Sequence, residues 1–201
     1  RAIVPDAPKL IDADDPKGDL FLPNKRYGEL AFPARHLVDV SSYHYSIDGV
    51  PALSMIAQLG CPFACGFCGG RESPMLRKIR TRTTESIIAE MRHLHETYGV
   101  RGVMFYDDEL NVNKQIVELM DAIAGMGIDW RLRGFVKSEL FTDRQAEAMF
   151  RAGVRWLLVG FESGSPRILE NINKKATRED NTRCLRTARK HGLKVKALMS
   201  L

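Results

Sequence analysis

The chain has 201 residues, a length that suits one domain of ordinary size. Apolar residues make up 44% of the chain and charged residues 27%, a composition that excludes intrinsic disorder over most of its length. No apolar run reaches the roughly 20 residues of a membrane span, and the first residues lack the apolar stretch of a signal peptide. The net charge of +5 comes from Lys and Arg residues spread along the chain, so we expect a solvated surface and no nucleic-acid partner.

Residues 1–50 differ in composition from the rest of the chain. Prolines at positions 5, 8, 16, 23 and 33 interrupt them, which predicts little regular secondary structure. We interpret residues 1–50 as a lead-in or linker that follows an upstream domain, and residues 51–201 as the core domain. The absence of an initiator Met agrees with a chain that begins inside a longer polypeptide.

After residue 50, strands and helices are predicted to alternate. Alternating apolar residues or short apolar runs predict strands at 53–59, 103–106, 128–133, 154–161 and 193–199. Capping signals predict helices that begin near residues 84, 142, 165 and 177, and apolar positions from Ile116 to Ile123 predict one more. Units of this kind form parallel sheets, either as a barrel or as an open doubly wound sheet. No Gly-x-Gly-x-x-Gly follows the first strand, which argues against a dinucleotide-binding fold.

The third predicted strand favours the barrel. Its apolar residues alternate with Asp129, Arg131 and Arg133. If the apolar set packs on helices, the two arginines point to the barrel interior, and we expect them to face an anionic ligand. Five strands cannot close an eight-stranded barrel. The predicted fold is therefore α/β, a partial parallel (β/α) barrel that is truncated after its fifth strand.

Three of the four cysteines lie within eight residues, directly after the first predicted strand. Cys61, Cys65 and Cys68 have the spacing Cys-x3-Cys-x2-Cys, which suits an iron–sulfur cluster or zinc in a reducing, cytoplasmic setting. Three thiolates can hold three irons of a cubane cluster and leave the fourth iron open. A closed site would need a fourth ligand, and only Cys184 could supply it. Because Cys184 lies on a predicted core-facing helix position, we expect it to pack in the core instead.

The cysteine motif resembles that of the radical S-adenosylmethionine (SAM) superfamily, in which Cys-x3-Cys-x-aromatic-Cys follows the first strand of a partial barrel. The aromatic residue here is Phe67, and the resemblance extends over residues 50–201. It implies a 4Fe–4S cluster held by the three cysteines, with SAM on the fourth iron, and reductive cleavage of SAM to a 5′-deoxyadenosyl radical. It also implies a small-molecule substrate and an electron donor such as flavodoxin or ferredoxin. A zinc loop or an ordinary ferredoxin loop is the alternative.

Other segments match motifs of this family less strictly. Where many members have Gly-Gly-Glu and bind the SAM amino group, this chain has Asp107-Asp108-Glu109. Carboxylates suit an ammonium partner, but the sequence leaves open which of the three contacts SAM. The alternative for each is a solvated acidic turn.

The resemblance continues after the fourth predicted strand. Glu162 and Ser163 lie in a stretch similar to Gly-x-(Glu/Gln)-Ser-Gly, whose acidic or amide residue binds the SAM ribose. The alternative for Glu162 is a buried salt bridge with Arg131 or Arg133. Lys174 matches a basic residue that pairs with the SAM carboxylate, and its alternative is an ordinary surface lysine. We also count Arg133 among the candidate cofactor contacts, because of its predicted inward direction.

The lead-in narrows the resemblance further. Residues 32–39 and Tyr43, followed by the strand into Gly60-Cys61-Pro62-Phe63, are similar to the junction in cobalamin-binding radical SAM proteins. This similarity implies an upstream cobalamin domain and methyl transfer to an unactivated carbon. The chain itself has no Asp-x-His-x-x-Gly cobalamin motif. Two alternatives stay open: a methylthiotransferase acting on RNA or protein, and a non-catalytic iron–sulfur or zinc module that binds nucleic acid.

Overall fold

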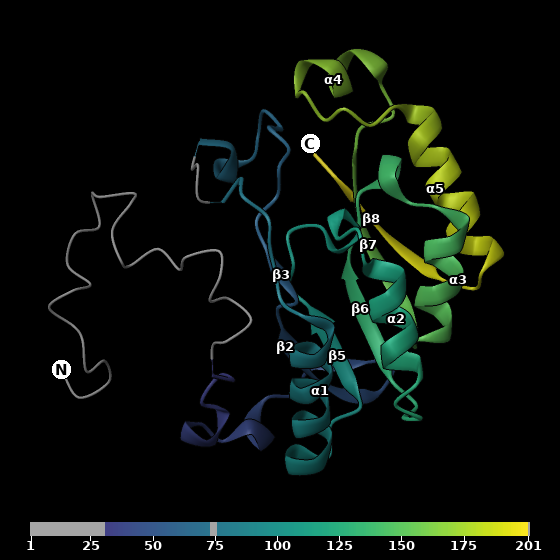
Figure 1. Cartoon of the computed structure of the whole chain (residues 1–201). Coiled ribbons are helices and arrows are strands. Elements are labelled where there is room, and N and C mark those ends of the chain that lie inside the picture. The colour runs from purple at the N-terminus through teal and green to yellow at the C-terminus, as the bar shows by residue number, and fades with distance from the viewer. Residues whose placement is uncertain (1–30, 73–75, 201) are drawn as a thin grey trace, which may run out of the picture.

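The computed structural model describes residues 31–72 and 76–200. Its main sheet has the strand order β1-β2-β5-β6-β7-β8, in which β1 is antiparallel to β2 and every other pair is parallel. The sheet curls as a half barrel, which confirms the predicted fold class (Figure 1). The strands of this sheet are β1 (Ser46–Ile47), β2 (Val50–Met55), β5 (Gly102–Phe105), β6 (Arg131–Phe135), β7 (Val154–Glu162) and β8 (Lys194–Met199).

Helices follow most of the parallel strands; α1, α2, α3 and α5 lie on one side of the sheet, and α4 lies beyond the ends of the strands (Figure 1). Their starting residues explain their positions. Thr83 accepts a hydrogen bond from the backbone of Ser86, and capping boxes open two of the later helices at Thr142 and Thr177. The helices are α1 (Thr84–Tyr98), α2 (Ile116–Ala124), α3 (Asp143–Arg151), α4 (Pro166–Asn171) and α5 (Arg178–Lys190). None of the described helices is long and apolar enough to cross a membrane.

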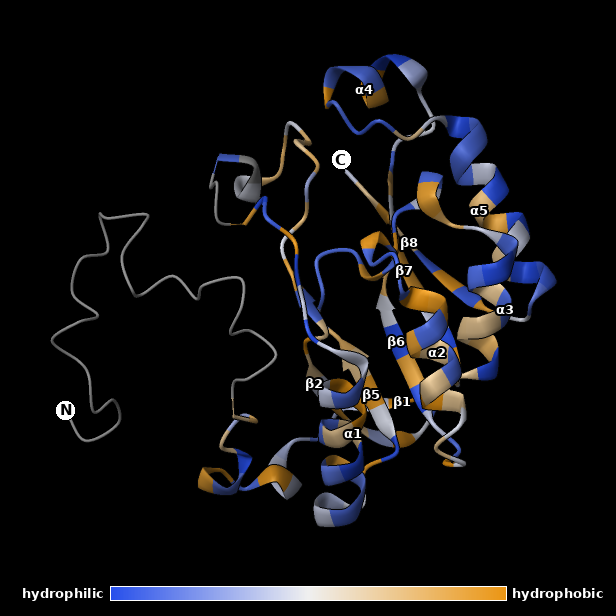
Figure 2. Ribbon diagram, viewed as in Figure 1, coloured by the Kyte–Doolittle hydropathy of each residue, from blue (hydrophilic) through white to orange (hydrophobic). Residues whose placement is uncertain are grey.

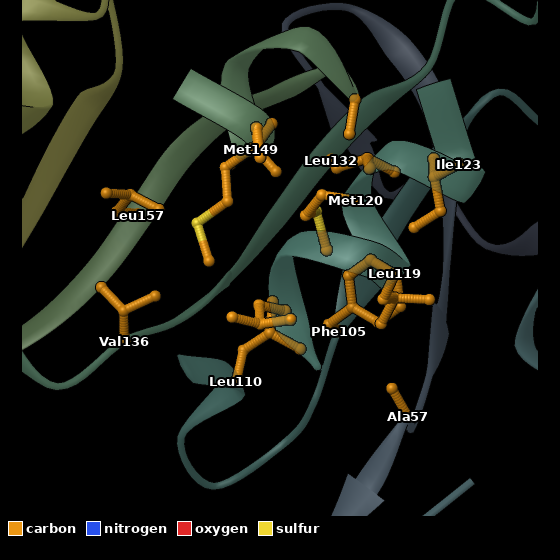
Figure 3. Packing of buried hydrophobic residues seen from close by; sticks show 14 of the residues in the cluster. Ala57, Phe105, Leu110, Leu119, Met120, Ile123, Leu132, Val136, Met149 and Leu157 are labelled. Carbon is orange, nitrogen blue, oxygen red and sulfur yellow. The ribbon is translucent and has the colours of Figure 1, made fainter. Parts of the chain in front are cut away.

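The hydrophobic core lies between the sheet and these helices. Figure 3 shows Leu119, Met120 and Ile123 of α2 packed with Phe105 and Leu132 of the sheet. Figure 2 shows apolar colour on parts of these helices and polar colour elsewhere on them. Each fully buried side chain of this size contributes about 1.5–3 kcal/mol, so this face stabilises the fold.

Cys184 of α5 is fully buried in the core, as predicted. Burial raises the pKa of its thiol to about 12, so it stays protonated at physiological pH.

Two strand predictions are wrong in their bounds. The first strand ends at Met55, because the carboxylate of Asp107 accepts hydrogen bonds from the backbone of Ala57 and Gln58 and draws the chain out of the sheet. Gln58–Leu59 (β3) then pairs with Arg80–Thr81 (β4) in a separate two-stranded sheet. The third strand begins at Arg131 instead of residue 128, since the Trp130 N–H bonds to Ile128 O in a tight turn.

The described part of the lead-in has more structure than predicted. It contains two short 3-10 helices, Arg35–Leu37 and Val40–Ser42, and the strand β1, which forms a hairpin with β2 across the predicted boundary at residue 50. The buried carboxylate of Glu90 in α1 pairs with both Arg35 and Arg82, which fastens the lead-in to the barrel. The expectation of low structure in residues 1–30 lies outside the described residues.

Candidate cluster and cofactor site

The functional candidates gather where the parallel strands end. The cysteine loop follows β3, the acidic segment follows β5, and Glu162 ends β7. In parallel α/β sheets, the carboxyl ends of the strands meet at one edge, which is where active sites form.

Gly60 and its neighbours fix the start of the cysteine loop. Gly60 has a φ of 91°, and a Cβ at this position would overlap the carbonyl oxygen of Lys78, so only glycine fits. Its N–H donates to Asp108 Oδ2 at 3.0 Å, and the next N–H, that of Cys61, donates to Leu76 O at 2.8 Å. The backbone of the first cysteine is therefore held from two sides.

The three thiols are free and differ in exposure: Cys65 is buried, Cys61 is half-buried and Cys68 is exposed. Burial raises the pKa of the Cys61 thiol to about 11, so metal binding has to displace its proton. Among the described residues, no three Cys, His, Asp or Glu side chains converge as a ready-made site for a single ion. The donor set nevertheless fits a cubane cluster, because three soft thiolates on one loop can each bind a different iron.

The structure separates the roles of the three acidic residues after β5. Asp107 is buried, and its two oxygens accept backbone hydrogen bonds from Ala57 (3.2 Å) and Gln58 (2.5 Å). Burial raises the pKa of its carboxyl group to about 7 despite these bonds. Asp108 holds the Gly60 N–H. Both side chains therefore support the loop that leads to the cysteines.

Glu109 differs from its two neighbours because its side chain faces lysines instead of backbone amides. Burial raises the pKa of its carboxyl group to about 7, while the charges of Lys174 and Lys137 act in the opposite direction. Its Oε2 is buried and has no hydrogen-bond partner. A buried carboxylate oxygen without a partner is costly, so this oxygen is suited to receive a cationic ligand.

Glu162 and Lys174 pair with each other. Glu162 Oε1 lies 3.4 Å from Lys174 Nζ, and both side chains are nearly buried. This contact contradicts the alternatives of a salt bridge to Arg131 or Arg133 and of a surface lysine. A Cβ at Gly160 would overlap the Glu162 carboxylate and approach Lys174 Nζ to 2.9 Å, so the absence of a side chain at Gly160 makes space for the pair.

Backbone geometry orients both members of this pair. Glu162 has a φ of 60°, and a hydrogen bond from Ser163 N to Phe161 O (2.7 Å) closes a tight turn around it. Positive φ values at Asn173 (52°) and Lys175 (70°) flank Lys174. Such conformations cost free energy in residues other than glycine and are concentrated at functional sites.

The loop that carries Lys174 is bound directly to the cysteine loop. Gly66 N donates to Ile172 O at 2.6 Å, and Asn173 Nδ2 donates to Ala64 O at 2.8 Å. A Cβ on Gly66 would crowd Ile172 O at 3.2 Å, which explains the glycine between two cysteines. The candidate cluster loop and the candidate SAM-binding lysine thus form one connected unit.

Lys137 is a site residue that the sequence did not reveal. Its ammonium group is almost fully buried, pairs with Glu139 Oε1 at 2.7 Å and donates to Lys174 O at 2.8 Å. It also lies 4.3 Å from the ring centroid of Phe63, inside the cysteine loop, where a cation–π attraction operates. The position of Lys137 directly after a strand was the one signal that could have identified it from the sequence, since it matches no motif.

The remaining candidates lie at the edges of this arrangement. Phe67 is exposed, with its ring centroid 5.9 Å from Lys174 Nζ. Ser163 Oγ accepts from Ser165 N at 3.1 Å. Arg133 lies mid-strand in β6, on the face opposite the core, whereas Arg131 pairs with Asp129 at the start of the strand. Arg133 is therefore the candidate placed farthest from the strand ends.

The comparison with protein families decides the relationship. The family model described as the radical SAM superfamily matches residues 55–201. The chain belongs to the radical SAM superfamily. Members of this family use a 4Fe–4S cluster and SAM, act on small-molecule substrates and require an electron donor. The family resemblance of the cysteine motif is confirmed.

Individual relatives carry methyltransferase names. The chain is 33% identical to an uncharacterized methyltransferase of Pyrococcus horikoshii over 168 residues, which cover 82% of this chain and 36% of that protein. It is 31% identical to the bacteriochlorophyllide d C-12(1)-methyltransferase of Chlorobaculum tepidum, with coverage of 64% and 28%. The chain thus spans about a third of the length of the curated relatives it matches.

Solved structures show the same fold. The radical SAM methyltransferase TsrM of Kitasatospora setae, with cobalamin and a 4Fe–4S cluster bound, superimposes with a TM-score of 0.66 at 21% identity, covering 75% of this chain and 31% of that one. The cobalamin-dependent radical SAM enzyme OxsB, with aqua-cobalamin bound, gives a TM-score of 0.62 at 16% identity, covering 73% and 23%.

Proposed function

We propose that this chain is the cluster- and SAM-binding part of a cobalamin-dependent radical SAM methyltransferase. Cys61, Cys65 and Cys68 would hold a 4Fe–4S cluster with one iron open to SAM. The observation that carries this proposal is the meeting of Glu109, Lys174 and Glu162 beside a cysteine loop to which the Lys174 loop is hydrogen-bonded.

The charges at this edge complement the polar groups of SAM. Glu109 would accept from the SAM ammonium group, and Lys174 would donate to its carboxylate. Glu162, with Ser163 next to it, would accept from the ribose hydroxyls, and the exposed ring of Phe67 would lie along the adenosyl part. Glu162 Oε1 lies 3.4 Å from Lys174 Nζ, and Glu162 Oε2 accepts from Ser200 Oγ at 2.7 Å. Because both side chains are nearly buried, SAM would have to replace these contacts with its own polar groups.

The protein's own residues position and shield the reacting groups. The bound cluster would supply the electron that cleaves SAM and generates the radical which abstracts hydrogen from the substrate. Lys137 contacts both the Lys174 loop and the cysteine loop and holds them in fixed relation, and the packing that buries Lys137 and Lys174 keeps water away from them. Asp107 and Asp108 hold the segment that leads into Cys61.

Methyl transfer and cobalamin dependence are supported by the relatives. Two curated relatives named as methyltransferases are at least 31% identical to this chain, and two solved structures of the same fold contain cobalamin. The chain is also 29% identical, over 78% of its length, to the anaerobic magnesium-protoporphyrin IX monomethyl ester cyclase of a Synechocystis strain. Ring-forming chemistry is therefore the second candidate. In either reaction, an external flavodoxin or ferredoxin would supply the electrons.

The test uses the full-length protein, produced with added cobalamin and reconstituted anaerobically with iron and sulfide. We expect a 4Fe–4S absorption band, bound corrinoid and formation of 5′-deoxyadenosine when SAM and a reductant are added. Protein that cleaves SAM but incorporates no corrinoid would contradict the cobalamin part alone. Protein with an intact cluster that neither binds nor cleaves SAM would contradict the whole proposal.

A further inference from the structure

The half barrel has a second face, opposite the hydrophobic core. Along β6, Leu132 packs in the core, so Arg131, Arg133 and Phe135 face the other way. Along β8, Val195 packs against the core, and Lys194 and Lys196 face the same way as Arg133. The helices α1, α2, α3 and α5 lie on the core side (Figure 1), so this second face is the barrel interior.

Strand register places these interior cations in neighbouring rows. Arg133 lies beside Trp156 of β7, which lies beside Lys194 of β8. In the next row toward the strand ends, Phe135 lies beside Leu158, which lies beside Lys196. In Figure 2, β6 and β8 show hydrophilic and hydrophobic stretches in alternation, in agreement with this assignment.

Two of the four interior cations are already paired. Lys194 Nζ lies 3.1 Å from Asp48 Oδ1, which also accepts from Trp156 Nε1 at 2.8 Å, so the hairpin between β1 and β2 crosses the floor of the half barrel. Arg131 pairs with Asp129 at 2.5 Å. Lys194 and Arg131 are therefore neutralised by Asp48 and Asp129 near the amino-terminal ends of the strands.

The other two cations, Arg133 and Lys196, have no ion-pair or hydrogen-bond partner within residues 31–72 and 76–200. The Arg133 Nε atom is buried as well as unpartnered. Leaving a buried charged donor unsatisfied is costly, unless a ligand completes it.

Their depth separates these cations from the proposed SAM site. Met199 pairs with Glu162 at the top of the sheet, and Lys196 lies three residues lower on β8. At about 3.3 Å per residue, this is roughly 10 Å below the proposed ribose contact, and the row of Arg133 is lower still. A substrate that lies along the inner face could therefore contact the cations with one end while a carbon nearer the strand ends faces the radical.

We propose that Arg133 and Lys196 bind an anionic group of the substrate, a carboxylate or a phosphate-type oxyanion, on the inner face of the half barrel, where the Arg133 Nε atom is buried and Lys196 is exposed. This inference rests on the proposed function, because it takes the radical to be generated at the strand ends above. Arg133 presents a planar guanidinium that can bind two oxygens at once, and Lys196 adds a point charge. The substrate class is therefore an anionic small molecule whose reactive carbon lies above its charged group.

The test measures binding of methylphosphonate, inorganic phosphate and acetate to the full-length, cluster-loaded protein by isothermal titration calorimetry. We expect Arg133→Gln and Lys196→Gln each to weaken binding of the preferred anion by about tenfold to 100-fold, the value of a charge-assisted hydrogen bond. Lys190→Gln is the charge-matched control, because Lys190 of α5 pairs with Asp143 of α3 on the outside of the molecule. This variant should change anion binding less than twofold. Tightest binding of acetate would indicate a carboxylate, and tightest binding of phosphate or methylphosphonate would indicate a phosphate-type group.

Three outcomes would overturn the inference. They are wild-type protein that binds none of the probes, equal weakening in Lys190→Gln, and loss of SAM affinity in Arg133→Gln in step with loss of anion binding. The last outcome would assign Arg133 to the cofactor site. SAM cleavage by the wild-type protein is measured in parallel, so a failure of the proposed function is seen separately from a failure of the anion site.

Discussion

The helix side of the sheet contrasts sharply with the edge where the parallel strands end. On the helix side, apolar residues from strands and helices interlock, and the buried carboxylate of Glu90 is paired with Arg35 and Arg82. At the carboxyl ends, Glu109, Lys137, Glu162 and Lys174 are all largely removed from water within one network. Burying charge costs stability, whereas burying apolar surface provides it. The comparison shows that the core stabilises an edge whose residues are arranged for binding.

The largest expected effect tests whether the three loop cysteines bind the cluster while Cys184 belongs to the core. Replacing Cys61, Cys65 or Cys68 with Ala should abolish the reconstituted cluster, because each would bind a separate iron. Cys184→Ala should keep the full iron content and lower the free energy of unfolding by only about 1 kcal/mol, as for an ordinary core truncation. Iron and sulfide analysis after anaerobic reconstitution measures the first effect. Loss of iron in Cys184→Ala equal to that in Cys65→Ala would contradict the open-iron arrangement.

The next effect concerns the buried ammonium group that joins the two loops. Lys137→Met leaves Glu139 buried without its cation, so we expect the free energy of unfolding to fall by about 3–5 kcal/mol. The double variant Lys137→Met/Glu139→Gln should recover part of this loss, because no unpaired charge is left. Chemical denaturation measures stability, and SAM affinity measures positioning. If the double variant regained both stability and full SAM affinity, a role of Lys137 in positioning Lys174 would be ruled out.

A smaller and more local change tests the space beside the Glu162–Lys174 pair. Gly160→Ala introduces a methyl group where the two side chains lie, so we expect SAM affinity to fall about tenfold, the value of one displaced charge-assisted contact. Gly164→Ala is the matched control, because a Cβ there meets nothing within 4 Å. Equal SAM affinity in both variants would remove the pair from the binding site.

The last effect, about as large over one pH unit as that of Gly160→Ala, is a pH dependence. The pKa of Glu109 is raised to about 7 by burial, so the carboxyl group is protonated below pH 7 and ionised above it. Only the ionised form attracts an ammonium group, so SAM affinity should fall by up to about tenfold per pH unit below 7. Glu109→Gln should bind SAM more weakly at high pH and lose this step. If the step persisted in Glu109→Gln, its source would be another group such as Asp107, whose pKa is also about 7.

Sequence patterns predicted the apolar side of the molecule well and the charged edge only in part. Helix starts at Thr83, Thr142 and Thr177 and the burial of Cys184 followed from local rules of capping and periodicity. The family motif identified the superfamily, as the comparisons confirm.

What the sequence could not predict depends on contacts between distant segments. The exit of the chain from the sheet after Met55 is determined by Asp107, some fifty residues later. Asp107 and Asp108 have a different role from Glu109 because backbone amides of the preceding loop lie near the first two carboxylates and not near the third. Lys137 becomes a site residue only because Phe63 and Lys174 meet around it.

The central claim is that SAM binds an open iron beside Glu109 and Lys174, and electron paramagnetic resonance of the reduced, full-length protein tests it most directly. We predict that SAM changes the spectrum of the reduced cluster in the wild-type protein. We predict also that Lys174→Met needs about tenfold to 100-fold more SAM for the same change. A wild-type spectrum that is identical with and without saturating SAM would contradict the claim.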